Sequence, residues 1–315
     1  MSIAARAFLL LLSTTFLWLS GRTEARAAGP ALPAEAAQAM EKMYGGDSEG
    51  AIQMLRQFER AQPENPLGYL LEGEAEWWKM YCAACDIKWG MVDAGRRGKM
   101  REDEAYLGLA DKAIKLGQAQ LAKSDSPEMH LYIGMGWALK ARLYSLRGEN
   151  RNTARAGVVA RAEFIRAVQM DPQMADATAG LGLYDYYVDT LSPIVRLLRL
   201  IVGIPGGNKR EGIREMETGI SQGTLMAVEA RFYLAKNLRT YDQQYERAAN
   251  LMEPLIARYP RNPSFLLLLG NLNAELHRYD RASEHFHSAL NLPNADPACA
   301  ARTRDIAQSY LAALH

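Results

Sequence analysis

The chain has 315 residues, of which 49% are hydrophobic and 23% are charged, and its formal net charge at pH 7 is +1. This composition argues against a disordered chain, and the balanced charge gives no electrostatic basis for binding nucleic acid or an anionic membrane. Few segments alternate polar and apolar residues with a period of two, so we expect an all-α fold.

Residues 1–27 have the three parts of a secretory signal peptide. Arg6 supplies a positive charge, residues 8–19 form an apolar run, and residues 25–27 fit the small-x-small rule for cleavage. The run is shorter than the roughly 20 residues that span a bilayer, which makes an uncleaved anchor the less favoured alternative. We therefore expect an exported protein of the periplasm or cell envelope. Cleavage removes three arginines and one glutamate and leaves a net charge of −1.

Residues 28–33 form a short Ala/Pro linker, and residues 34–315 are predicted to form one domain of helix pairs. Pro66 is predicted to open the second pair, because the first turn of a helix tolerates a missing N–H. An insertion at 82–103 interrupts this pair. Insertions in repeats usually fall on one face and often carry function.

A third helix pair is predicted at 129–170, and a fourth begins near Ala175. A second insertion, 186–208, follows the first helix of the fourth pair. Its apolar part, 191–204, contains two arginines and is too short to span a bilayer, although it could lie against a membrane surface. Asn208 is predicted to cap the helix that follows it.

The clearest repeats are residues 229–262 and 263–296. The repeat positions are Phe232, Ala248, Met252, Leu255 and Pro260 in the first, and Leu266, Leu269, Gly270, Ala282, Phe286 and Ala289 in the second. Gly270 would lie where two helices cross, since a larger side chain would push the axes apart, and Phe286 would fill the remaining space. A last helix, 298–314, has a polar face and would cap the stack.

This pattern resembles the tetratricopeptide-repeat superfamily, in which two antiparallel helices recur every 34 residues. The resemblance implies a right-handed α-solenoid of about six helix pairs with two insertions and a C-terminal capping helix, in which repeats contact only their neighbours. Members of the superfamily are mostly binding scaffolds. Residues 175–265 also resemble the inclusion-body-clearance group of these proteins, through a Tyr-Asp-Tyr-rich helix, an apolar stretch with proline and the segment PGGNKREGI. That group also consists mainly of scaffolds, so neither resemblance implies a reaction.

The cysteines offer the sharpest local motif, Cys82-Ala-Ala-Cys85. Haem attachment would need a histidine where Asp86 stands, and a zinc site would need a second ligand pair, although Cys299 is the one other cysteine. In an exported protein the pair could be a structural disulfide, two free thiols or a redox centre. We expect a disulfide between Cys82 and Cys85, with Cys299 left single.

Other signs of chemistry are weak. His285 and His287 are two residues apart and point to different faces, whereas a helical metal pair needs i, i+4 spacing. The segment 206–209 could hold an anion at a helix N-terminus, but a glycine turn between helices is the favoured interpretation. The sequence shows neither a P-loop nor a nucleophile–base arrangement. We expect no metal, no cofactor and no enzymatic activity.

Two asparagines indicate a binding face. Asn237 and Asn271 occupy the same position in consecutive repeats, and Tyr233 lies one turn before Asn237. In tetratricopeptide repeats these positions of the first helix line the concave face. Because an asparagine amide can both donate and accept, these residues could hold the backbone of an extended peptide. The alternative is two ordinary surface asparagines.

Trp77, Trp137 and Lys140 lie on first helices at a similar depth and are further candidates for partner contact. We expect Trp77 or Trp78 to be exposed, because adjacent residues of a helix cannot both face one core.

Together these patterns favour a non-enzymatic scaffold that binds a protein or peptide in its concave groove. Two alternatives stay open. One is a redox or accessory enzyme that uses Cys82 and Cys85. The other is an envelope-assembly protein that docks on a membrane through residues 191–204 without spanning it.

Overall fold

The computed structural model describes residues 32–84, 99–191, 203–293 and 296–314. These residues form helices, turns and loops, and none of them forms a strand. The helices are α1 (Ala34–Tyr44), α2 (Ser48–Ala61), α3 (Pro66–Ala84), α4 (Glu102–Leu121), α5 (Pro127–Leu146), α6 (Asn150–Met170), α7 (Ala175–Thr190), α9 (Lys209–Gln222), α10 (Ala227–Tyr241), α11 (Tyr245–Arg258), α12 (Pro263–Glu275), α13 (Tyr279–Leu290) and α14 (Pro297–Ala313). The predicted signal peptide and the middle of both insertions lie outside the described residues.

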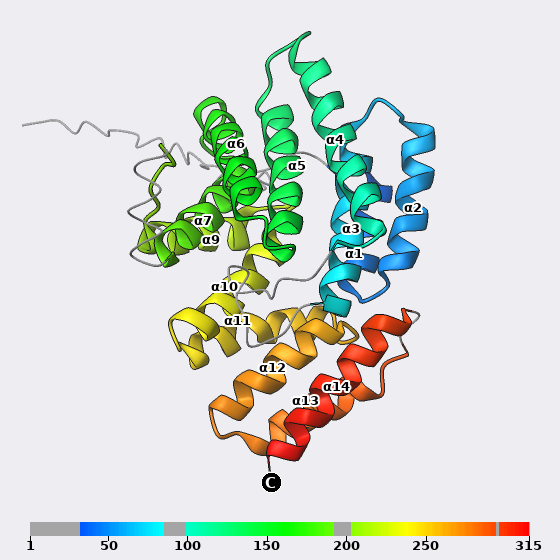
Figure 1. Cartoon of the computed structure of the whole chain (residues 1–315), viewed down its shortest axis with the longest axis vertical. Helices are drawn as coiled ribbons and strands as arrows, with labels where there is room; N and C mark the ends of the chain where they lie inside the picture. The colour runs from blue at the N-terminus through cyan, green and yellow to red at the C-terminus, as the bar shows by residue number, and fades with distance from the viewer. Residues whose placement is uncertain (1–31, 85–98, 192–202, 294–295, 315) are drawn as a thin grey trace, which may run out of the picture.

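The helices pack in series as antiparallel pairs, which Figure 1 shows from α1 at the blue end to α14 at the red end. The pairs are α1 with α2, α3 with α4, α5 with α6, α7 with α9, α10 with α11, and α12 with α13, and α14 follows as a last helix. This arrangement confirms the expected all-α solenoid of helix pairs with a terminal helix. No helix within the described ranges combines the length and the hydropathy needed to cross a bilayer.

Glycines set how closely the paired helices approach. A Cβ at Gly270 would lie 2.8 Å from the Phe286 ring, so the small residue and the aromatic fit together as the repeat pattern predicted. The same device recurs in the middle of the chain. The Phe164 ring of α6 would meet a Cβ at Gly134 of α5 at 2.7 Å and one at Gly180 of α7 at 2.5 Å. Larger residues at these positions would separate the helix axes.

The segment PGGNKREG is explained by close packing of α9 and its preceding loop on α7. A Cβ at Gly182 would lie 2.6 Å from the carbonyl oxygen of Gly212, and one at Gly207 would lie 2.3 Å from that of Asp185. Asn208 caps α9 as predicted, because its side-chain oxygen accepts from two N–H groups of the first turn at 3.0 and 3.2 Å. The motif therefore has a packing role.

The stack closes on itself, so the expectation that repeats contact only their neighbours is wrong. Helix α3 of the second pair packs against α14 as well as against its sequence neighbours. The turn after α1 meets the turn before α12, where Asn262 Nδ2 donates to the backbone oxygen of Tyr44 at 2.9 Å. Gly46 in this turn has φ +90°, and a Cβ there would lie 2.6 Å from the carbonyl oxygen of Arg261. One continuous core therefore joins the first repeats to the last.

Candidate functional site

Four of the predicted binding residues lie inside the closed stack. The exposed fraction is 0% for Asn237, 1% for Asn271, 1% for Tyr233 and 1% for Trp77. Trp77 Nε1 on α3 donates to the Tyr233 hydroxyl on α10 at 2.7 Å. The prediction that these side chains project into an open groove is therefore wrong for this conformation, because α3 covers the inner face of the last repeats.

The two asparagines differ in what they contact. Asn271 accepts a hydrogen bond from Arg239 Nε at 2.7 Å, so it orients a guanidinium within the protein. Asn237 faces the hydroxyl of Tyr187, but their geometry falls short of a hydrogen bond. Burial raises the pKa of Tyr187 well above its usual value, and the nearby Asn237 amide partly offsets this rise.

Trp77 and Trp78 are both buried, which corrects the expectation that one of them is exposed. The Trp78 ring lies 5.1 Å from Phe232 and 5.6 Å from Phe265, measured between centroids. Trp77 instead faces the Tyr233 hydroxyl. Helix α3 has packed neighbours on several sides because the stack closes around it, so adjacent residues can point into different parts of one core.

A buried ionic cluster sits where the first helices converge. Arg142 of α5 donates through Nη1 to Glu74 of α3 at 2.7 Å, and through both Nη atoms to Glu229 of α10 at 2.6 Å. All three side chains are at least 95% buried. Burial and, to a smaller extent, the Glu229 charge raise the pKa of Glu74 to about 8, against the opposing effect of Arg142. The raised pKa favours a neutral Glu74 carboxyl at pH 7, while Arg142 stays hydrogen-bonded to both glutamates.

The sequence analysis did not single out this cluster. The one sign of the cluster in the sequence is that charged residues occur on largely apolar helices, such as α3, which has twelve buried residues. Such residues are seldom buried unless they are paired. The partners could not be identified, because they lie on three helices far apart in the sequence.

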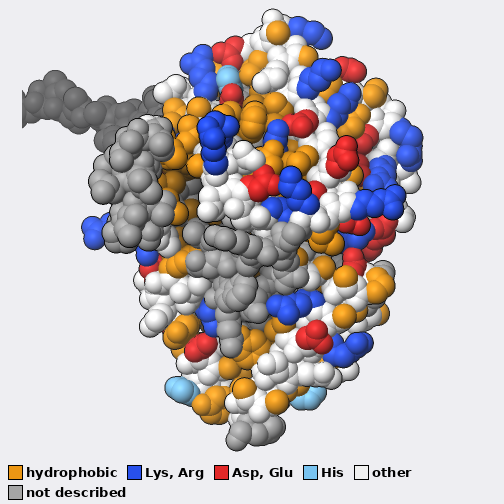
Figure 2. All heavy atoms as spheres, in the orientation of Figure 1, with side chains coloured by type: hydrophobic (Ala, Val, Ile, Leu, Met, Phe, Trp, Pro, Cys, Tyr) orange, Lys and Arg blue, Asp and Glu red, His pale blue; other side chains and the backbone are white. Residues whose placement is uncertain are grey.

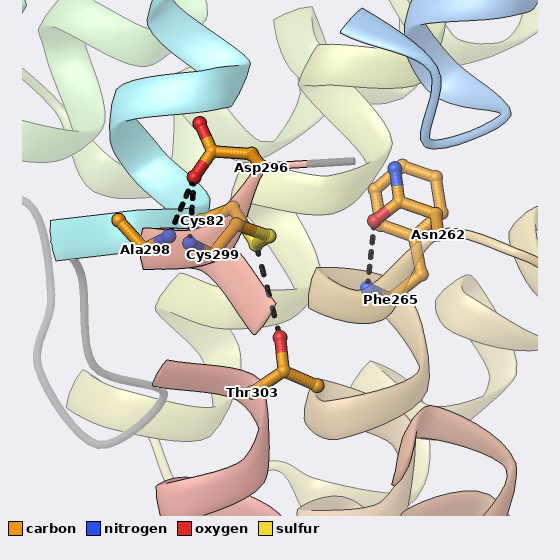
Figure 3. The surroundings of a disulfide bond; sticks show 7 residues. All are labelled: Cys82, Asn262, Phe265, Asp296, Ala298, Cys299 and Thr303. Atoms are coloured by element: carbon orange, nitrogen blue, oxygen red, sulfur yellow. Dashed lines mark hydrogen bonds between the residues drawn. A yellow bond between two sulfur atoms is a disulfide. The ribbon is translucent and has the colours of Figure 1, made fainter. Parts of the chain in front are cut away.

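The disulfide prediction is also corrected. Cys82 at the end of α3 is bonded to Cys299 in the first turn of α14, with 5.0 Å between their Cα atoms (Figure 3). Asp296 caps α14 and accepts from the N–H groups of Ala298 and Cys299 at 2.8 and 2.9 Å, which fixes this turn. Cys85 lies outside the described residues. Closure of the stack is what brings two cysteines 217 residues apart within bonding reach.

Trp137 and Lys140 are the predicted contact residues that remain partly accessible. Both lie on α5, and Lys140 Nζ is 4.5 Å from the centroid of the Trp137 ring. The same ammonium lies 2.5 Å from Asp111 Oδ1 on α4. This cation–π contact, held by an ion pair, leaves Lys140 largely buried, with 13% of its side chain exposed, and Trp137 partly accessible beside the exposed Asp111.

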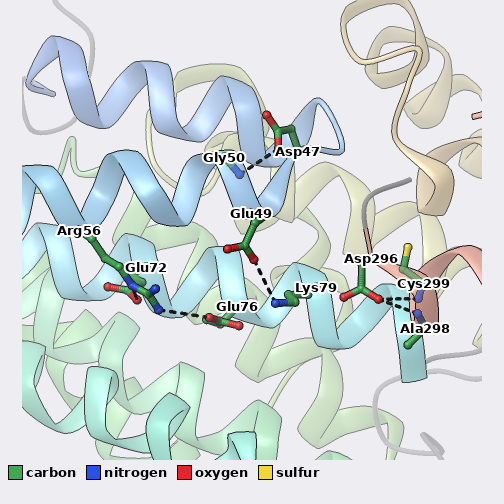
Figure 4. Close-up of polar contacts among 10 residues, drawn as sticks. All are labelled: Asp47, Glu49, Gly50, Arg56, Glu72, Glu76, Lys79, Asp296, Ala298 and Cys299. Carbon is green, nitrogen blue, oxygen red and sulfur yellow. Dashed lines mark hydrogen bonds and ion pairs between the residues drawn. The ribbon is translucent and has the colours of Figure 1, made fainter. Parts of the chain in front are cut away.

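Ionic contacts also line the seam between α2 and α3 (Figure 4). Arg56 Nε donates to Glu72 Oε1 at 2.8 Å, and Lys79 Nζ lies 3.2 Å from Glu49 Oε2. Nearby, burial and the Glu72 carboxyl raise the pKa of Glu59 to about 8. These contacts tie consecutive repeats together and do not converge on a common point.

A hollow of about 500 Å³ lies beside the start of α9. It is lined by Asp189, Asn208, Lys209, Arg210, Ile213, Asp242 and Gln244. The donors that could bind an anion there already pair with aspartates of the protein itself. Asp189 accepts from the backbone N–H of Lys209 at 3.0 Å, and Asp242 pairs with its ammonium. Within the described ranges, no group of three or more His, Cys, Asp or Glu side chains is arranged to hold a metal ion.

A comparison with protein families supports the repeat assignment. A family model described as tetratricopeptide repeat matches residues 237–298, which include all of α11, α12 and α13. Together with the paired helices, this match supports a relationship to the tetratricopeptide-repeat superfamily. It gives no support to the finer resemblance to the inclusion-body-clearance group. A comparison with curated proteins gives no match.

Proposed function

We propose that this protein is an exported, non-catalytic scaffold that binds a protein partner on the surface of its helical repeats. The observation that carries the proposal is the stack of helix pairs together with the tetratricopeptide match at residues 237–298. Repeats of this kind generally mediate contacts between proteins. Stacked repeats offer extended surfaces for such contacts.

The partner surface that we propose is the exposed edge of the Trp137–Lys140 stack. Tryptophan is enriched among the residues that dominate binding energy at interfaces. Lys, Arg, Asp and Glu side chains are interspersed over the described part of the face in Figure 2. Lys140 and its partner Asp111 place charges of both signs beside the Trp137 ring, so binding there should depend only weakly on salt.

Export is supported by the predicted signal peptide at residues 1–27 and by the disulfide between Cys82 and Cys299, since disulfides persist in oxidising compartments. The redox alternative is less favoured, because Cys82 is bonded to Cys299 and not to Cys85. Contact with a membrane surface through residues 191–204 stays a prediction, because most of this segment lies outside the described residues.

The test is capture of partners from an envelope extract of the source organism by the immobilised mature protein. We expect Trp137→Ala and Lys140→Ala each to weaken capture of the proteins that the wild type retains. The matched control is Lys112→Ala, because Lys112 also stacks on an aromatic ring, that of Tyr69, at 5.5 Å from its centroid. If all variants capture the same proteins equally well and keep the wild-type melting temperature, the contact surface does not lie on α5.

A further inference from the structure

Helix α14 contributes little buried apolar surface of its own. Its buried residues are Cys299, Thr303, Ile306 and Ala307. By contrast, α12 buries ten residues, which include Phe265 and several leucines. Because stabilisation by burial is roughly proportional to apolar area, non-covalent packing holds α14 much less firmly than α12.

Further apolar contacts of α14 come from partly buried residues at its far end, among them Tyr310 and Leu311. The Tyr310 ring stacks on Phe286 of α13, with centroids 5.2 Å apart and planes 7° from parallel. Tyr310 is only partly buried, whereas Phe286 is fully buried. Helix α14 therefore acts as the cover of an aromatic residue that belongs to the last repeat.

The disulfide is the covalent link between α14 and α3, and it lies at the first turn of α14 (Figure 3). Cys82 is half-buried and Cys299 is buried, so an incoming thiolate has better access to the Cys82 sulfur. Burial opposes the charge of Lys79 on α3, but Glu49 and Glu76 raise its pKa, and Asp296 adds a smaller effect of the same sign (Figure 4). Lys79 and Asp296 are partly exposed, so this attraction is screened and weak.

We infer that the Cys82–Cys299 bond is a redox latch that holds α14 over the last repeat. A thiolate of an external dithiol attacks Cys82 Sγ, the S–S bond breaks, and Cys299 leaves as a thiolate that takes up a proton. The second thiol of the reductant then attacks the mixed disulfide and releases Cys82. The protein disulfide is reduced by two electrons, and the dithiol becomes a cyclic disulfide.

Breaking the latch favours opening of α14, because its residual packing rests on few side chains. Opening would uncover Phe286 and the adjoining faces of α12 and α13. Helices with few buried contacts open locally at a lower free energy than the rest of the fold. The redox state of the latch would thereby control whether this apolar surface is exposed. This inference does not depend on which protein the scaffold binds.

The experiment is hydrogen exchange, followed by mass spectrometry, on the mature full-length protein with and without dithiothreitol. We expect amides of α14 to exchange about tenfold faster or more after reduction, while those of α12 change by less than about twofold. Cys299→Ser should show the fast α14 exchange under both conditions. The matched control is Cys85→Ser, which keeps the latch and should respond to reduction like the wild type.

Two results would overturn the latch. One is equal protection of α14 in the oxidised and reduced wild type. The other is acceleration of α12 and α14 by the same factor, because the bond would then be a general stabiliser of the fold. Since the wild type alone distinguishes these outcomes, the test does not depend on whether a variant folds.

Discussion

Replacing Arg142 by methionine removes the guanidinium that Glu74 and Glu229 share in the centre of the closed stack. Methionine has a similar length, so the change tests charge more than volume. Removing one partner of a buried ion pair typically costs about 3–5 kcal/mol, because an uncompensated charge is left behind. We expect the free energy of unfolding to fall by this amount at pH 7.

The two glutamates should respond differently to neutralisation. The pKa of Glu74 is raised to about 8, so at pH 7 the folded protein holds this carboxyl mostly neutral while the unfolded chain ionises it. Glu74→Gln should therefore leave stability at pH 7 unchanged or raise it, by up to about 3 kcal/mol. Glu229 makes two hydrogen bonds with Arg142 at 2.6 Å each. Glu229→Gln therefore leaves the guanidinium without its main counter-charge and should cost about 3 kcal/mol or more.

The assay is equilibrium unfolding in urea, followed by circular dichroism of the mature protein at pH 7. The matched control is Arg247→Ala, which breaks an exposed pair with Glu217 at 2.7 Å and should cost less than about 1 kcal/mol. Equal losses for Glu74→Gln and Glu229→Gln would refute the reasoning, because they would show that both carboxyls carry charge in the folded protein.

Three further predictions concern pH, the buried asparagine and helix packing. Between pH 4.5 and about 8 the folded protein retains a Glu74 proton that the unfolded chain loses, so the free energy of unfolding falls by about 1.4 kcal/mol per pH unit as pH rises. Unfolding measured across this window should show a shallower decline of this free energy for Glu74→Gln than for the wild type. An unchanged slope would contradict the raised pKa of Glu74. Asn271→Ala should cost about 1.5–3 kcal/mol, because Arg239 loses a buried acceptor, and an unchanged melting temperature would show that the site is not buried as described. Gly182→Ala should cost about 1–3 kcal/mol, because its Cβ would lie 2.6 Å from a facing carbonyl oxygen. Gly108→Ala is the control, because a Cβ there has nothing within 4 Å, and it should be neutral or stabilising in the same thermal melt. Similar effects of the two changes would count against the tight α7–α9 contact.

The helix pairs could be predicted from the sequence because their determinants are local. Gly270 and Phe286 lie within one repeat, and a 34-residue period places them on facing helices whatever the rest of the chain does. Asn208 caps a helix that begins at the next residue. In each case the residues that define the contact are close enough in sequence for spacing alone to fix their relation.

The candidate site could not be predicted in the same way. Whether Asn237 faces a groove or a core depends on the curvature of the stack, which accumulates from small rotations between successive repeats. Curvature here brings α3 against α10 and α14, which buries Trp77 and joins Cys82 to Cys299. The CxxC spacing favoured a local pair and carried no information about a partner 217 residues away.

The central claim is that the helical stack closes, so that its second repeat is joined to its last helix. Mapping the disulfides of the mature protein by mass spectrometry, without reductant and after blocking free thiols, tests this claim most directly. We predict a cross-linked peptide that joins Cys82 to Cys299, with Cys85 carrying the blocking group. A peptide with a bond between Cys82 and Cys85, and a blocked Cys299, would contradict the closed arrangement.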